Sequence, residues 1–191
     1  TGATKKSLWI HAIKRFIILW ILGMIVQGNL LSYDISQFHT YANTLQAIAS
    51  GYLISFIIIL YLPVIYQIAA TAGLLLTYWA IVALIPIGGT TAGAYSMTSN
   101  VPLIFDHMIL GRFHDGLPYT WIISSLNFGA TTMLGVFSGY MMQSPQDKMK
   151  KFRNYVILCI SLIVIALIWC IWQPIIKKIY TGSFVLFAGG I

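Results

Sequence analysis

Few side chains in this sequence could take part in acid–base chemistry, and most of them lie in two polar segments. The chain holds four acidic residues and four histidines among its 191 residues. The segments 32–43 and 88–119 contain six of these eight: Asp34, His39, Asp106, His107, His114 and Asp115. A histidine that is oriented by a carboxylate can act as a general base, and a cluster of histidines and aspartates can bind a metal.

Two interpretations of these six residues stay open. In the first, Asp106, His107 and Asp115 contact a substrate at the surface of the protein. In the second, they are the ordinary polar residues that short loops contain. Their spacing matches no metal-binding motif, so we expect no bound metal, and we assign no catalytic residue.

A line of polar and small residues inside the apolar segment 120–142 is a second candidate site. Its members recur at intervals of three or four residues, and we name them the polar seam: Ser124, Asn127, Thr131, Gly135 and Ser138. This spacing puts them on one face of a helix, and lipid cannot satisfy them, so the face must contact other helices or a cavity. We predict substrate contact for Ser124, Asn127 and Thr131, and close helix packing for Gly135 with Gly139. The alternative is that the whole seam only joins helices.

The apolar segment 44–62 carries a shorter polar stripe, in which Gln46 is a further candidate for substrate contact. Glutamine inside a membrane also commonly bridges helices, and that alternative stays open. The apolar segments contain no Asp, Glu, Lys or Arg in their cores. This absence argues against a proton pump or an ion-coupled transporter that uses charges within the membrane, but it leaves a passive or sugar-type carrier possible.

The elements that position these residues are predicted from hydropathy. The chain is 59% hydrophobic and 8% charged, whereas a soluble domain has about 25% charged residues. Apolar segments of roughly 18 residues or more are typical of membrane-spanning helices. We therefore predict an all-α, polytopic transmembrane helix bundle that forms a single domain over residues 1–191. Five complete spans are expected at 16–31, 44–62, 66–87, 120–142 and 155–172.

A sixth apolar segment begins near Ile179 and is still apolar at Ile191. Because the chain also starts at Thr1 rather than at a methionine, we expect an internal fragment of a longer protein with a truncated sixth span.

The basic residues predict the orientation of the bundle. The N-terminal segment and the segment 143–154 carry four Lys or Arg each, whereas the alternate segments carry three in total. The positive-inside rule then puts the first two in the cytoplasm and residues 88–119 outside it. Within 88–119, Pro102 and Gly111 bound a short amphipathic helix at 102–110. The net charge of +7 comes from basic residues in short clusters between the apolar segments, where they indicate topology, so we expect no nucleic-acid partner.

Several short segments, in this order, resemble one family of polytopic membrane proteins: 43–48 with Leu45-Gln46, the helix 104–111, Leu126-Asn127 followed by Leu134-Gly135 through Gly139, and 174–184. The family includes heparan-α-glucosaminide N-acetyltransferase and its bacterial relatives, some described as predicted N-acetylglucosamine-related transporters. The bacterial branch is the more similar one. This chain has Ala47 where the lysosomal enzymes have a basic residue.

The resemblance implies a membrane protein that handles amino sugars, with acetyl-CoA as co-substrate and no covalently bound cofactor. It also implies an integral protein of the bacterial inner membrane. In the enzyme branch, an acetyl group from cytosolic acetyl-CoA passes to a glucosamine on the far side of the membrane. The histidine that carries it belongs to a motif that this chain lacks, so His39, His107 and His114 are not assigned its role.

Three functions are therefore weighed. The first is an acyltransferase-like membrane protein that acts on an amino sugar, the second an N-acetylglucosamine-related transporter, and the third a non-catalytic assembly subunit. The expected partners are the lipid bilayer and a small sugar, and the sequence leaves a homo-oligomer open.

Overall fold

The computed structural model describes residues 4–191, which fold into helices joined by loops, without strands. Its α-helices follow one another as α1 (Lys5–Val26), α2 (Thr44–Tyr61), α3 (Val64–Leu84), α4 (Val101–Leu110), α5 (Ser125–Gln143), α6 (Lys148–Trp169) and α7 (Gly182–Gly190). The predicted all-α class is confirmed.

Four of these helices are long and apolar enough to cross a membrane: α1, α2, α3 and α6. They indicate an integral membrane protein. The sequence predicted five complete spans, the first of them at 16–31, whereas α1 begins at Lys5 and ends at Val26. The difference in the number of spans lies in α5. This helix has 19 residues, but its polar seam and glycines lower its hydropathy below that of the other four. The predicted sixth segment forms α7, which begins only at Gly182 because the Thr181 side chain accepts a hydrogen bond from the Phe184 N–H and caps the helix.

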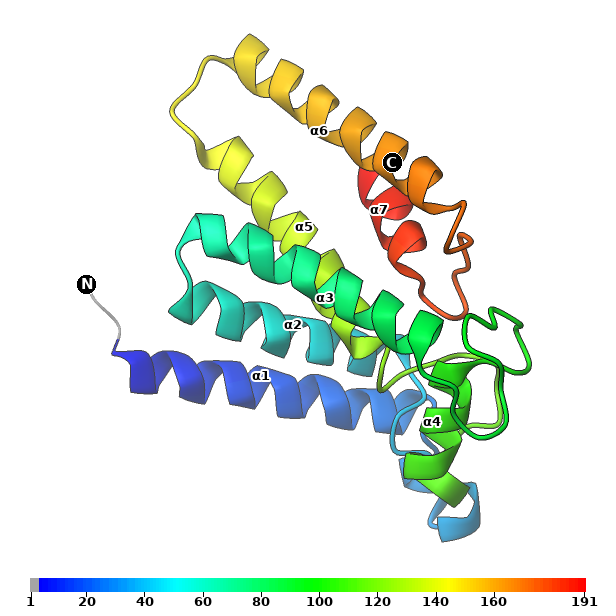
Figure 1. Ribbon diagram of the computed structural model, residues 1–191. Coiled ribbons are helices and arrows are strands. Elements are labelled where there is room, and N and C mark those ends of the chain that lie inside the picture. The colour runs from blue at the N-terminus through cyan, green and yellow to red at the C-terminus, as the bar shows by residue number, and fades with distance from the viewer. Residues whose placement is uncertain (1–3) are drawn as a thin grey trace.

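Helix α5 occupies the centre of the bundle and contacts α2, α3, α6 and α7. Figure 1 shows α1, α2 and α3 running back and forth along one side of it, while α6 diverges from α5 and α7 lies between them. The α2–α3 turn and the α5–α6 loop lie towards the same end as the start of α1. Helix α4 and the remaining connections lie at the opposite end, which we call the α4 end (Figure 1).

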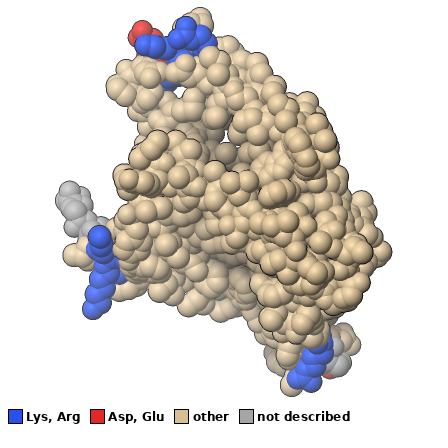
Figure 2. Space-filling model, viewed as in Figure 1, with Lys and Arg blue, Asp and Glu red and all other residues tan. Residues whose placement is uncertain are grey.

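The surface matches the expected contact with lipid. Large apolar side chains are exposed along α1 and α6, among them Ile17, Ile18, Ile157 and Leu167. Figure 2 shows Lys and Arg gathered at the extremities of the molecule, with an almost uncharged surface between them. Burying this apolar area in hydrocarbon is favourable, because water is kept from it.

Helices α2 and α5 approach each other closely at two glycines. A Cβ atom at Gly51 would lie 2.7 Å from the Phe128 carbonyl oxygen, and one at Gly129 would lie 2.6 Å from Ile54 Cγ2. Gly135 and Gly139, which the sequence predicted to pack, would meet nothing within 4 Å. That prediction is wrong for contacts within the described chain.

Candidate functional site

A cavity of about 360 Å³ opens at the α4 end, between α2, α5 and the segment that leads into α7. Five aromatic residues line it: Tyr119, Trp121, Phe128, Tyr180 and Phe184. Four threonines add hydroxyl groups, and two aliphatic side chains and two lysines complete the lining: Thr44, Thr120, Thr131, Thr132, Ala47, Ile48, Lys177 and Lys178. An apolar and aromatic wall with a few polar groups is the usual character of a small-molecule site. We call this space the cavity.

The structure brings Ser124, Asn127 and Thr131 together, but only Thr131 faces the cavity. Asn127 is fully buried, and its Nδ2 donates to the Tyr180 carbonyl at 2.6 Å. Ser124 is also fully buried, and its hydroxyl donates to the Ile179 carbonyl at 3.1 Å. These two residues therefore support the backbone behind the cavity wall. Asn127 Oδ1 is buried without a hydrogen-bond partner in the described chain.

Three hydroxyl groups donate hydrogen bonds to the Ile179 carbonyl. It accepts from Tyr78 at 2.6 Å, from Ser124 at 3.1 Å and from Thr120 at 3.2 Å. The next residue, Tyr180, has a left-handed backbone with φ of 55°. This geometry, rare for a residue with a side chain, is held by the contacts around it. Tyr78 was missed in the sequence, where an isolated tyrosine in an apolar segment carries no signal of such a role.

Gln46 lies outside the cavity and holds the start of α2. Its Oε1 accepts from the Ala42 N–H at 2.9 Å and from the Asn43 N–H at 3.1 Å, and its Nε2 donates to the Thr40 carbonyl at 2.7 Å. With the Asn43 side chain it forms a capping box, which satisfies N–H groups at the helix start. The neighbouring residues Thr44 and Ala47 line the cavity instead.

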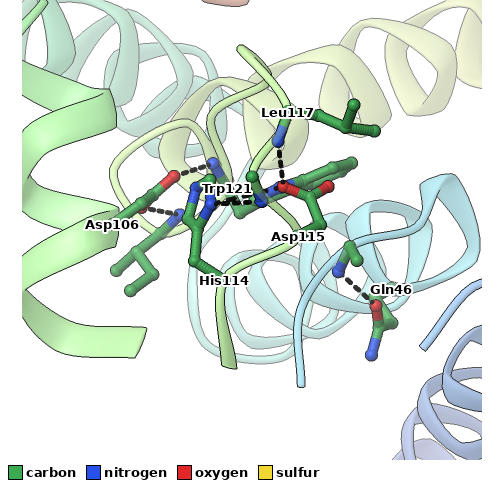
Figure 3. Close-up of polar contacts among 9 residues, drawn as sticks. Gln46, Asp106, His114, Asp115, Leu117 and Trp121 are labelled. Atoms are coloured by element: carbon green, nitrogen blue, oxygen red, sulfur yellow. Dashed lines mark hydrogen bonds and ion pairs between the residues drawn. The ribbon is translucent and has the colours of Figure 1, made fainter. Parts of the chain in front are cut away.

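Asp106 is a buried residue that connects α4 to the segment leading into α5. The sequence placed it on the polar face of an amphipathic helix, but it is fully buried, while Met108 is exposed. Its carboxylate accepts from the Trp121 N–H at 2.6 Å and from the Ile122 N–H at 3.0 Å (Figure 3). Burial raises the pKa of Asp106 to about 6, although these two N–H groups act in the opposite direction. Because Trp121 lines the cavity, Asp106 helps to position the cavity wall.

His107, His114 and Asp115 form a separate cluster at the α4 end. The rings of His107 and His114 stack with their centroids 3.9 Å apart. His114 Nδ1 accepts from the Gly116 N–H at 2.9 Å and lies 3.4 Å from Asp115 Oδ1 (Figure 3). Asp115 Oδ1 in turn accepts from the Leu117 N–H, so the cluster is built into a local turn. None of the three residues lines the cavity.

The His114 imidazole is neutral near pH 7. Burial, assisted by His107 and His39, lowers its pKa to about 4, and an Nδ1 that accepts a hydrogen bond leaves the proton on Nε2. Burial raises the pKa of Asp115. Within residues 4–191, His114 Nε2, Asp115 Oδ2 and His39 Nδ1 are buried without a hydrogen-bond partner. The folded protein therefore resists protonation of His114.

This burial predicts that acidification destabilises the protein through His114. A histidine with a lowered pKa stabilises the fold above about pH 6.5, and that contribution is lost as the pH falls towards 4. The contribution of His114 to the thermal unfolding midpoint in detergent should therefore be lost between pH 7 and pH 4. The raised pKa values of Asp106 and Asp115 act in the opposite direction, because each stabilises the fold at low pH and loses that effect as the pH rises through its folded pKa, which is about 6 for Asp106.

The variant His114→Asn isolates the histidine contribution, because an amide oxygen can accept from the Gly116 N–H but does not titrate. The midpoint of the variant relative to that of the wild type should therefore rise as the pH falls from 7 to 4. Equal slopes for the two proteins would show that His114 titrates normally in the folded state.

No protein-family model matches this chain, and no curated protein matches it. The fold and the cavity define an integral, helical membrane protein with a ligand-sized cavity at one end.

Proposed function

We propose that this protein is a membrane-embedded, acyltransferase-like protein that binds an amino sugar in the cavity. The supporting observation is the cavity lining, which combines five aromatic rings with four threonines around a space of about 360 Å³. Aromatic rings supply flat apolar area for the faces of a sugar ring, and hydroxyl groups can bond to its own hydroxyls. The resemblance in the sequence supplies acetyl-CoA as the acyl donor.

The proposal includes a fifth and a sixth crossing of the membrane. Helix α5 has 19 residues, which is long enough for the fifth crossing. Its polar side chains are acceptable inside a membrane, because α5 contacts four other helices and these side chains have partners inside the bundle. Helix α7 would be the start of the sixth. The basic start of α1 and the basic start of α6 lie away from the α4 end, which supports a cytoplasmic position for both (Figure 2).

In this orientation the cavity opens on the far side of a bacterial inner membrane. Acetyl-CoA would act from the cytoplasm, and residues 88–119 would lie outside it. The cavity lining contains no histidine, aspartate or glutamate among the described residues. Its side chains are therefore proposed to bind and orient the sugar, and we assign none of them as the general base.

Filling the cavity should strongly lower the activity. Ile48 lines the cavity and is about half exposed, so Ile48→Trp adds bulk there without disturbing the core. Proteoliposomes that contain the full chain, with labelled acetyl-CoA on the cytoplasmic side and glucosamine on the other, should form labelled N-acetylglucosamine. Ile48→Trp should lower the rate at least tenfold, since one misplaced reacting group can cost a factor of about 100.

The matched control is Ile57→Trp, which changes an exposed residue of α2 away from the cavity and should leave the rate unchanged. Full activity in Ile48→Trp would contradict the proposed cavity. Uptake of labelled N-acetylglucosamine without acetyl-CoA would instead support the transporter, and the absence of both activities would support an assembly subunit.

A further inference from the structure

We propose that the sugar ligand of the cavity is carried on a lipid phosphate, with the phosphate at Lys177 and Lys178 and the hydrocarbon tail along the apolar wall. This inference rests on the proposed sugar site and names the class of its ligand. It follows from three features: two unpaired lysines, a wall that continues to the lipid-facing surface, and a backbone that fixes the lysines at the cavity.

The first feature is the unbalanced positive charge. Lys177 and Lys178 both line the cavity, and no acidic residue does. In the part of the chain that the structure describes, neither lysine forms an ion pair, and the carboxylate of Asp106 is used by two backbone N–H groups. Two adjacent lysines on the proposed outer side also run against the positive-inside rule. A negatively charged ligand group would balance them.

The second feature is the shape of the apolar wall. Ala47, Ile48, Phe128 and Phe184 line the part of the cavity that belongs to α2, α5 and α7. Ile48 is 52% exposed, so this wall continues onto the outer surface of α2, which the bilayer would cover. A free, water-soluble sugar would not need an opening towards lipid, because it has no apolar part to place there. A hydrocarbon tail can leave the cavity through it and stay in lipid.

The third feature is the fixed position of the two lysines. The Lys178 carbonyl accepts from the Thr120 N–H at 3.3 Å and from the Thr120 hydroxyl at 3.4 Å. The next carbonyl, that of Ile179, is held by three hydroxyls as described above. The lysine side chains therefore start from an anchored segment, which lowers the entropic cost of holding a phosphate. The rings of Tyr119 and Trp121 lie in the same cavity and can contact the sugar.

Binding of short-chain lipids to the full chain in neutral phosphatidylcholine nanodiscs tests the inference. Calorimetric titration would compare dioctanoyl phosphatidic acid, dioctanoylglycerol, which has the same tails without phosphate, and inorganic phosphate, which has no tail. The lipid phosphate should bind saturably and at least tenfold more tightly than the other two. Each lysine near a lipid phosphate contributes about fivefold in affinity, so Lys177→Gln with Lys178→Gln should weaken binding by roughly 25-fold.

Two variants separate the cavity from general attraction to lipid. Lys150→Gln with Lys151→Gln removes an adjacent lysine pair from the opposite end and should leave the affinity unchanged. Ile48→Trp should weaken binding of the lipid phosphate, because it narrows the opening for the tail. Equal binding of dioctanoylglycerol, equal binding of inorganic phosphate, or no effect of Ile48→Trp would each overturn the inference.

The inference and the proposed function can fail separately. Acetylation of free glucosamine together with no preference for the lipid phosphate would overturn the lipid-linked ligand and leave the sugar site in place. Specific binding of the lipid phosphate without any acetyl transfer would overturn the acyltransferase and leave the lipid phosphate site in place.

Discussion

Replacing Asp106 by leucine is expected to lower the free energy of unfolding by about 3 to 5 kcal/mol, because two buried N–H groups lose their acceptor and each costs about 1–3 kcal/mol. Those groups belong to Trp121 and Ile122, and the carboxylate that accepts from them is fully buried. Leucine has a similar shape and no acceptor. Unfolding by increasing mole fractions of dodecyl sulfate in mixed micelles measures the difference.

Asp106→Asn should cost about half as much, since the amide keeps one acceptor oxygen for the two donors. Asp147→Leu is the matched control, because Asp147 lies at the exposed start of α6 and its side chain forms no capping hydrogen bond. It should change the free energy of unfolding by less than about 0.5 kcal/mol. Wild-type stability in Asp106→Leu would show that the two N–H groups do not depend on this carboxylate.

Removing the Asp106 carboxylate should also change the cavity. Trp121 lies in the cavity wall and its N–H is held by Asp106, so the variant releases part of that wall. Ligand affinity should therefore fall in Asp106→Leu even under conditions where the protein stays folded. The carboxylate is thus expected to act through Trp121 as a positioning residue.

Replacing Gly51 by alanine is expected to lower the free energy of unfolding by about 1–3 kcal/mol, the usual cost of overpacking. The added Cβ would lie 2.7 Å from both the Phe128 carbonyl oxygen and Thr132 Oγ1. The backbone oxygen cannot rotate away, so α2 and α5 must separate. Because Thr44, Ala47 and Thr131 belong to these two helices and line the cavity, the cavity should widen and bind its ligand less tightly.

Gly135→Ala provides the comparison, since a Cβ there would meet nothing within 4 Å. Alanine favours a helix over glycine by about 1 kcal/mol, so this variant should be as stable as the wild type or more stable by up to that amount. The same dodecyl sulfate titration measures both variants. A larger loss at Gly135 than at Gly51 would contradict the packing of α2 against α5.

Hydropathy was sufficient to predict the helical class and the positions of α2, α3 and α6, because lipid exposure requires long apolar segments. It did not predict which face of α5 meets which partner. The spacing of Ser124 and Asn127 placed both on one face, but their acceptors are the carbonyls of Ile179 and Tyr180, more than fifty residues away. Only the tertiary structure brings these carbonyls to that face.

The same limit explains two predictions that the structure corrects. Asp106 looked like a solvent-facing residue because its acceptor role depends on N–H groups at positions 121 and 122, which no local pattern around α4 reveals. Gly135 and Gly139 match the Gly-x-x-x-Gly spacing, which is typical of close helix packing. Gly51 and Gly129, which do pack, lie in two different helices: Gly51 meets Phe128 and Thr132 of α5, and Gly129 meets Ile54 of α2.

The Ile179 carbonyl has a consequence for how the protein is made. Its donors Tyr78 and Ser124 precede it by 101 and 55 residues, so the ribosome releases both long before their acceptor is synthesised. Until then these hydroxyls have to be satisfied by water, by their own helices or by the insertion machinery. The hydrogen bonds from Tyr78 and Ser124 to this carbonyl can therefore form only after the α6–α7 connection has emerged, and the wall of the cavity is completed late in biogenesis.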